Sequence, residues 1–280
     1  MGKKLYLTDL DGTLLNREST VSCRSRDIIN SLINSGTMFT YATARSYNSA
    51  KIVTDGLSVK LPIIVFNGAF IYDISKDKFL HSSFFKESDI LFFMELSRLY
   101  GFTPLVYTFI GSTEKILWNK NGNLSSGFLY YLSKRKNDKR MCAVESLEES
   151  FSGEIFYITF IDDYEKLLPM YRSIESIMHF NCIFQQELYR KEYWCEIMPE
   201  SVDKASAACR LKSILKCDEL IVFGDSLNDI PMFKIADRSY AVMNANDRLK
   251  QIATEVIGYN YDDSVAVKLS EIEGLDVTEL

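Results

Sequence analysis

The chain has 280 residues, of which 47% are hydrophobic and 25% are charged. This composition is typical of an ordinary soluble globular protein, and the length is enough for about two domains. The net charge is −6, which disfavours nucleic acid or an anionic membrane surface as a partner. The sequence contains no apolar run long enough to span a membrane.

The cysteine spacing and the first residues of the chain indicate the cellular compartment. No two cysteines are spaced as a CxxC pair, so a zinc knuckle is not expected. We expect no signal peptide, because Asp9 comes too early for an apolar segment to precede it. Reduced thiols in a cytoplasmic protein are the simplest interpretation. The six cysteines are Cys23, Cys142, Cys182, Cys195, Cys209 and Cys217.

The first motif follows the apolar residues 5–7, which predict a buried strand. It consists of Asp9, Asp11, Gly12 and Thr13. Two acids two positions apart project to the same side, and they repel each other unless a cation or a proton lies between them. The pattern indicates a metal-assisted site in which one carboxylate attacks and the other transfers protons. The alternative interpretation is a strand that ends in an ordinary Asp-Gly turn.

A strand–helix alternation continues as far as residue 69. Strands are predicted over 38–42 and 63–66, and helices over 22–33 and about 47–57, the first of them capped by Ser22. This order predicts a parallel sheet with right-handed crossovers, in which ligands bind at the carboxyl ends of the strands. The residues at those ends are Asp9, Thr43 and Asn67.

The middle of the chain, from residue 83 to 193, has an α+β pattern and lacks acids at its strand ends. We interpret it as an inserted domain, so that 1–82 and 194–280 together form a discontinuous core. The charged segment 134–140 is interpreted as a solvated surface loop. The expected fold class is therefore α/β, with a Rossmann-like parallel-sheet core and an inserted α+β domain.

The second motif, 224–229, repeats the pattern of the first: an apolar strand ends, a glycine turns the chain and acids follow. Together, Asp9, Asp11 and Asp225 offer the hard oxygen ligands that Mg²⁺ prefers. In the alternative interpretation, the acids of this segment and Ser226 only turn the chain and cap a helix. Two such clusters at strand ends favour the metal site.

These motifs resemble those of the haloacid dehalogenase-like hydrolases, and within them the Cof-type sugar-phosphate phosphatases. The segment 9–13 looks like the first family motif, Thr43 stands at the second, Lys204 at the third, and 224–229 looks like the fourth. The segment 67–69 (Asn-Gly-Ala) resembles a further feature of the Cof group. The resemblance covers the whole chain.

The resemblance implies a Mg²⁺-dependent phosphomonoester hydrolase with an aspartyl-phosphate intermediate. Asp9 would attack phosphorus, and Asp11 would protonate the leaving oxygen and then activate water. Mg²⁺ would be held by the Asp9 carboxylate, the Asp11 backbone carbonyl and Asp225, with Ser226 also in the metal site. The expected phosphate-binding residues are Leu10, Thr43, Ala44, Lys204 and Asn228; the expected supporting or substrate-binding residues are Thr13, Arg45, Asn67, Gly68 and Asp229.

Three positions call for separate comment. Lys204 is predicted in the first turn of a helix, where electrostatics disfavour a cation; something should hold it there, and phosphate is the candidate. Arg45 either binds substrate or pairs with a surface acid. Ala44 stands where the family usually has Gly, which bears on the fine geometry of phosphate binding.

The position of the insertion, between Asn67 and Lys204, indicates the large α/β cap that the resemblance associates with small phosphorylated metabolites. Most of its aromatic residues are interpreted as core, while one or two, from a set that includes Trp194, could stack on a sugar. The leading prediction is a sugar-phosphate phosphatase. The alternatives are a phosphatase for a phosphorylated cofactor, such as a flavin or pyridoxal phosphate, and a non-catalytic sensor of a phosphorylated ligand. We expect a monomer or a weak homodimer.

Overall fold

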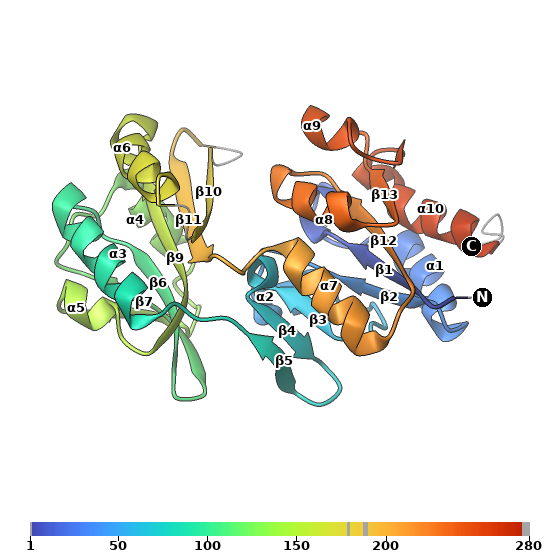
Figure 1. Cartoon of the computed structure of the whole chain (residues 1–280), viewed down its shortest axis with the longest axis horizontal. Helices are drawn as coiled ribbons and strands as arrows, with labels where there is room; N and C mark the ends of the chain where they lie inside the picture. The colour runs from blue at the N-terminus through green and yellow to red at the C-terminus, as the bar shows by residue number, and fades with distance from the viewer. Residues whose placement is uncertain (1, 178–179, 187–189, 276–280) are drawn as a thin grey trace. The chain divides into compact units, whose positions relative to one another are not determined.

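The computed structural model divides into two compact units (Figure 1). The first, which we call the core unit, comprises Met1–Ser82 and Val202–Leu280, and the second, the cap unit, comprises Ser83–Ser201. The predicted fold class, a parallel-sheet α/β core with an inserted α+β domain, is confirmed. The structure describes residues 2–177, 180–186 and 190–275.

The core unit is built on a parallel sheet with a short antiparallel extension. Its strands are β1 (Lys4–Thr8), β2 (Met38–Tyr41), β3 (Ile63–Val65), β4 (Phe70–Asp73), β5 (Lys78–Ser82), β12 (Glu219–Gly224), β13 (Arg238–Ala241) and β14 (Glu255–Val256). The parallel order is β14-β13-β12-β1-β2, and a bridge between Ala42 and Ile64 joins β3 in parallel beside β2. Strands β3, β4 and β5 pair antiparallel. The carboxyl ends of β12, β1, β2 and β3 therefore meet along one edge of the sheet.

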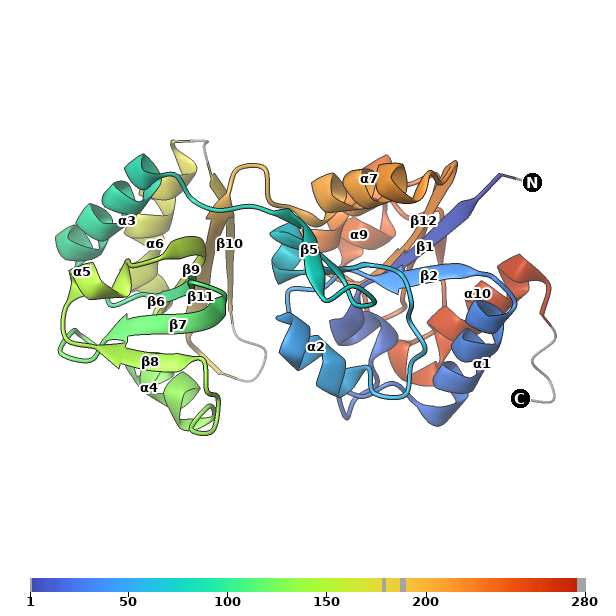
Figure 2. The same ribbon diagram turned by 90° about the horizontal axis from the view of Figure 1, so that it is seen from below.

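Helices cover both faces of this sheet. The helices are α1 (Cys23–Asn34), α2 (Tyr47–Val53), α7 (Lys204–Leu215), α8 (Ile230–Ile235), α9 (Asp247–Lys250) and α10 (Ser264–Glu273), with short turns η1 (Leu10–Leu14), η2 (Phe66–Gly68), η3 (Leu227–Asp229) and η4 (Asn260–Asp262). In Figure 2, α7 lies on one side of the strands and α1 and α10 lie on the other. Because both faces are covered, the central strands read as continuous apolar runs; Leu5, Leu7 and Ile221 are fully buried.

The sequence predicts the start of one helix correctly and the end of another incorrectly. Ser22 caps α1 as predicted, since its hydroxyl accepts a hydrogen bond from the Ser25 N–H. Helix α2 ends at Val53 and not near residue 57. Gly56 adopts a positive φ of 84° just beyond it, a conformation through which a right-handed helix does not continue.

The cap unit contains a second sheet with helices on both of its faces. Its strands are β6 (Leu105–Ile110), β7 (Thr113–Asn119), β8 (Met141–Val144), β9 (Glu154–Asp162), β10 (Phe180–Gln186) and β11 (Tyr193–Pro199), in the order β10-β11-β9-β6-β7-β8. Its helices are α3 (Glu87–Tyr100), α4 (Ser126–Ser133), α5 (Leu147–Ser150) and α6 (Tyr164–Glu175). Neighbouring residues of β6 point to opposite faces: Val106 packs in the cluster under α3 and α6, and Leu105 packs with Phe128 of α4. Figure 2 shows α4 on the side of this sheet away from α3.

Helix α4, strand β8 and helix α5 have no counterpart in the sequence-based prediction. Helix α4 spans only eight residues, with a glycine and aromatic residues of modest helix propensity. Such a segment is stabilised by packing against a sheet, and its own periodicity is too short to predict it. The charged segment 134–140 connects α4 to β8.

The second domain boundary must be corrected. The sequence pattern places it between residues 193 and 194, but the cap unit continues to Ser201. Strand β11 pairs along its length with β10 on one side and with β9 on the other, so it is an interior strand of the cap sheet. A strand's own sequence does not reveal which sheet it joins.

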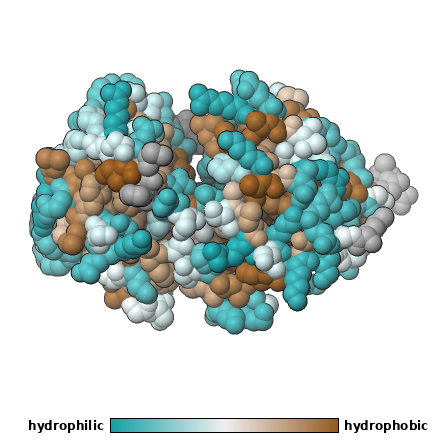
Figure 3. Space-filling model, in the orientation of Figure 1, coloured by the Kyte–Doolittle hydropathy of each residue, from teal (hydrophilic) through white to brown (hydrophobic). Residues whose placement is uncertain are grey.

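No helix in the described parts of the chain is long and apolar enough to cross a membrane. On the face shown in Figure 3, hydrophilic and hydrophobic residues are interspersed over both units.

Candidate active site

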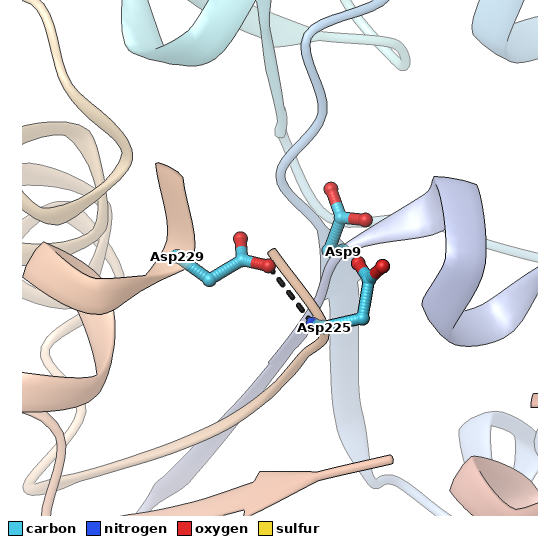
Figure 4. Close-up of side chains that lie close together, drawn as sticks. All are labelled: Asp9, Asp225 and Asp229. Carbon is cyan, nitrogen blue, oxygen red and sulfur yellow. Dashed lines mark hydrogen bonds between the residues drawn. The ribbon is translucent and has the colours of Figure 1, made fainter. Parts of the chain in front are cut away.

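Two strand ends of the core unit bring three carboxylates together. The Asp9 N–H donates to the Phe223 carbonyl at 3.0 Å, which fixes the end of β1 beside the end of β12. Asp9, Asp225 and Asp229 each place a carboxylate oxygen within 4.8 Å of the other two. Figure 4 shows the Asp9 and Asp225 side chains next to each other, with Asp229 reaching toward the backbone of Asp225. Both predicted motifs thus meet at one point.

Lys204 lies inside this cluster and is only 1% exposed. Its Nζ is 2.5 Å from Asp9 Oδ1 and 2.7 Å from Asp229 Oδ1. Burial alone would lower the pKa of Lys204, but the two carboxylates outweigh burial and raise it. Two buried carboxylates of the chain hold this lysine in the structure, and its predicted role in phosphate binding stays a prediction.

Two backbone N–H groups and a helix cap hold the Asp229 side chain in place. Its Oδ2 accepts hydrogen bonds from the N–H groups of Asp225 and Ser226, both at 3.0 Å. Ser226 completes a capping box with Asp229 at the start of η3. The capping that the sequence offered as an alternative interpretation is thus present, and the same aspartate also belongs to the acidic cluster.

The cluster holds more negative charge than Lys204 neutralises. Burial, followed by the repulsion of Asp229, raises the pKa of Asp225 to about 7. Burial also raises the pKa of Asp9 well above its ordinary value, although Lys204 opposes this shift. Carboxylates with raised pKa values at one point indicate a site that lacks positive charge.

Asp11 is outside the cluster of Asp9, Asp225 and Asp229 and pairs with Arg45. The guanidinium contacts both carboxylate oxygens, with Nε 2.7 Å from Oδ2 and Nη2 2.6 Å from Oδ1, a bidentate geometry that fixes orientation. Arg45 also donates from Nη1 to Ser49 Oγ at 3.1 Å. Of the two interpretations of Arg45, pairing with an acid is the one seen, and the acid is itself a predicted site residue.

The turn after Asp9 is held from three directions. Gly12 has φ of 77°, and a Cβ there would lie 2.3 Å from Asp225 Oδ2, so only glycine fits. Thr13 donates from Oγ1 to Asp225 Oδ1 at 3.0 Å. The Gly12 carbonyl accepts from Asn244 Nδ2 at 2.8 Å. Asn244 was not predicted as a site residue, although it follows the end of β13 and the strand-end rule applies there too.

Thr43 and Asn67 lie together at the ends of β2 and β3. The Asn67 N–H donates to the Thr43 carbonyl at 2.9 Å, and Thr43 Oγ1 accepts from the Arg45 N–H at 3.1 Å. Asn228 donates from Nδ2 to Asn67 Oδ1 at 3.1 Å. The Asn228 Oδ1 is buried and has no hydrogen-bond partner among the described residues, which is uncommon for a buried oxygen.

The segment after β3 follows a left-handed path. Phe66, Asn67 and Gly68 have φ values of 50°, 53° and 104°, and such strain in residues other than glycine is concentrated at functional sites. A Cβ on Gly68 would lie 2.3 Å from the Asp203 carbonyl oxygen. Gly68 thus lets this segment pack directly against the residue that precedes Lys204.

Two of the predicted phosphate-binding residues, Leu10 and Ala44, have apolar side chains that offer no hydrogen bond to a phosphate. The Leu10 side chain is fully buried and packs in the core, and the Ala44 side chain is exposed. Their predicted roles depend on backbone N–H groups and remain predictions.

Comparison with known proteins places the chain in a family. A family model described as haloacid dehalogenase-like hydrolase matches residues 6–269. The chain belongs to the haloacid dehalogenase-like hydrolases. The prediction that the chain is a member of this superfamily is confirmed, and so is the prediction that it is a hydrolase. The curated relatives of this hydrolase are named as phosphatases, in agreement with the predicted enzyme class.

Several relatives match the hydrolase over nearly its whole length. A 5-amino-6-(5-phospho-D-ribitylamino)uracil phosphatase of Bacillus subtilis is 28% identical over 288 residues, covering 96% of this chain and 98% of the relative. A second Bacillus subtilis protein of the same name is 26% identical, covering 97% and 98%. The solved structure of a haloacid dehalogenase-like hydrolase from Bacteroides thetaiotaomicron has a TM-score of 0.80 at 22% identity, covering 96% of this chain and 99% of that chain. A subclass IIB sugar phosphatase has a TM-score of 0.72 at 17% identity, covering 97% and 99%. These structures establish the fold.

Proposed function

We propose that this hydrolase is a Mg²⁺-dependent phosphatase that cleaves phosphomonoesters of small metabolites through an aspartyl-phosphate. The observation that carries the proposal is the buried cluster of Asp9, Asp225, Asp229 and Lys204 at the ends of β1 and β12. A purely structural ion cluster would not need three carboxylates for one lysine, because each buried charge without a partner is costly.

The donor set fits Mg²⁺. The carboxylates of Asp9 and Asp225 are hard oxygen ligands, and the backbone carbonyl of Asp11 is the third group that we assign to the ion. Asp229 is already bonded to two N–H groups and to Lys204, so we assign it a supporting role, and Ser226 likewise. When bound, Mg²⁺ supplies positive charge to the cluster and to the phosphoryl oxygens.

The first half of the reaction belongs to Asp9 and Asp11. A carboxylate oxygen of Asp9 forms a bond to phosphorus while the bond from phosphorus to the ester oxygen breaks, and Asp11 donates a proton to that departing oxygen. Lys204, in contact with Asp9, favours its ionised form and counters charge that develops on the phosphoryl group. Water then attacks the phosphorus of the aspartyl-phosphate, Asp11 accepts its proton, and phosphate and Asp9 are released.

Arg45 gives Asp11 a defined orientation for both proton transfers. The two short contacts fix the orientation of the Asp11 carboxylate, and we assign this side chain to proton transfer and not to the metal. We assign phosphate binding to Thr43, Lys204, Asn228 and the backbone N–H groups of Leu10 and Ala44. The unpartnered Oδ1 of Asn228 is a hydrogen-bond acceptor, which a bound water would satisfy.

The substrate class is the finer part of the proposal. Sugar phosphates remain the leading substrates, and the cap unit is the part of the chain to which we assign their selection. The two Bacillus subtilis relatives act, by name, on a phosphorylated ribitylaminouracil, which favours a phosphorylated cofactor or its precursor as the second candidate. The proposal places the enzyme in the cytoplasm, as a monomer or weak homodimer without nucleic-acid or membrane partners; its free cysteines fit a reducing compartment.

A phosphate-release screen tests the proposal. The full chain with MgCl₂ would be tested against sugar phosphates, ribitylaminouracil phosphate, flavin mononucleotide, pyridoxal phosphate and an activated aryl phosphate, with Asp9→Asn as the matched control. We expect release by the native chain, none by Asp9→Asn, loss in EDTA and recovery with Mg²⁺. Release by Asp9→Asn at the native rate would refute the assignment of the nucleophile. No release from any compound would favour the non-catalytic sensor.

A further inference from the structure

A small cavity in the cap unit involves the charged segment 134–140, which the proposed reaction does not use. The cavity has a volume of about 190 Å³ and lies between the end of α4 and the start of β11. Lys134 and Arg135, the first residues of the charged segment, line it together with Arg190. Most of the segment is exposed, as predicted, and its first two residues also line this cavity.

All three of these cations lie over tyrosine rings, with Lys134 Nζ 5.2 Å from the ring centre of Tyr130. The Arg135 guanidinium lies 3.7 Å from the ring centre of Tyr131, and the Arg190 guanidinium lies 4.1 Å from that of Tyr130. Stacking holds a guanidinium in one plane and leaves its N–H edge for other partners. The cavity thus has oriented hydrogen-bond donors.

The cavity carries an excess of positive charge. Arg190 donates from Nε to Oε2 of the buried Glu192 at 2.9 Å, so these two charges are paired. Lys134 and Arg135 form no ion pair with any carboxylate in the described part of the chain. The nearby Asp138 is already bound at 2.6 Å by Arg140.

The walls of the cavity belong to well-packed elements. A Cβ on Gly127 would lie 2.7 Å from Glu192 Cγ, so this glycine allows α4 to approach β11. Ser125 caps α4 and donates from Oγ to the Ile161 carbonyl at 2.5 Å. Trp194 packs edge-on against Tyr131, with ring centres 5.4 Å apart.

We propose that this cavity binds the oxyanion group, phosphate or carboxylate, of a small metabolite that also carries a planar ring. Lys134 and Arg135 supply the charge and the donors for the oxyanion, and the ring of Trp194 supplies a surface for stacking. The volume of about 190 Å³ suits one ring with one oxyanion and is too small for a peptide. The proposed site lies within the cap unit, and the proposal does not depend on the proposed phosphatase activity.

The test uses the full chain and phenylphosphonate, which joins a ring to an oxyanion and has no ester bond to hydrolyse. The chain has two tryptophans, so Trp118→Phe leaves Trp194 as the only one, and its fluorescence reports on the cavity. We expect a saturable change with phenylphosphonate, a weaker response to inorganic phosphate and none to phenol. Lys134→Gln combined with Arg135→Gln should weaken binding at least about tenfold, since two charge-assisted contacts are lost.

Lys136→Gln is the matched control, because Lys136 is an exposed cation of the same segment that does not line the cavity. It should leave the affinity unchanged. Calorimetry on the chain with both tryptophans repeats the comparison, should Trp118→Phe impair folding. The proposal is overturned if fluorescence and calorimetry show no saturable binding, if the double variant binds as tightly as the parent, or if Lys136→Gln weakens binding equally. The ligand cannot be turned over, so failure of the phosphatase proposal would leave this result intact.

Discussion

Replacing Lys204 with methionine should destabilise the core unit strongly. The side chain is 1% exposed and contacts Asp9 and Asp229. Methionine keeps much of the volume but leaves two buried carboxylates without their cation. Removing one partner from a buried ionic group costs about 3–5 kcal/mol. Lys212, on the same helix, pairs at 3.0 Å with Asp237 and is 27% exposed, and such surface pairs contribute about 0–1 kcal/mol.

The assay is urea unfolding of Lys204→Met and of the control Lys212→Met, both in EDTA at pH 8. We expect the free energy of unfolding to be lower in Lys204→Met by about 3 kcal/mol relative to the control. The difference should shrink as the pH is lowered, because burial raises the pKa of Asp9 and protonation removes the unpaired charge. Equal stability of the two variants at pH 8 would refute the reasoning that Lys204 neutralises buried carboxylates.

Three further outcomes are expected. In EDTA, the free energy of unfolding should fall by up to about 4 kcal/mol as the pH rises from about 4 to about 7. Burial raises the pKa of Asp225 to about 7, so over this range the folded state holds a proton that the unfolded state releases. MgCl₂ should remove most of this loss of stability. Arg45→Gln should slow phosphate release from an alkyl phosphate by up to about 10²-fold, because Asp11 loses its orientation. Phosphate release from an aryl phosphate should be slowed less, because an aryl leaving group needs less protonation. Gly68→Ala should destabilise the fold by about 2 kcal/mol or more and lower activity, because its Cβ would displace the Asp203 carbonyl.

Each of these outcomes has a control or a contrary result. Stability in EDTA that rises over the same pH range would contradict the raised pKa of Asp225. If Arg45→Gln slows phosphate release equally from the alkyl and the aryl phosphate, Arg45 acts on something other than proton transfer. Gly36 has φ of 102° with open space around it, so Gly36→Ala carries the same backbone strain without the clash. If Gly36→Ala and Gly68→Ala are equally destabilised, packing against Asp203 is unimportant.

The sequence alone determined the strand ends and therefore the place of the candidate site. Apolar runs of strand length that end in Asp9 and in Gly224-Asp225 carry their signal locally, because strand periodicity and turn residues are properties of neighbours in the chain. The rule that parallel strands present their carboxyl ends at one edge then brings both motifs together. The cap of α1 at Ser22 was predictable for the same local reason.

Only the tertiary structure decided which partners these residues have. Lys204 follows Asp9 by 195 positions, and nothing local shows that two carboxylates bury it. The pairing of Arg45 with Asp11, the place of β11 within the cap sheet and the eight-residue α4 depend likewise on packing between distant segments. Charge pairing and burial act through space, so a charged side chain such as Arg135 or Lys204 reads as a surface residue until the fold places it.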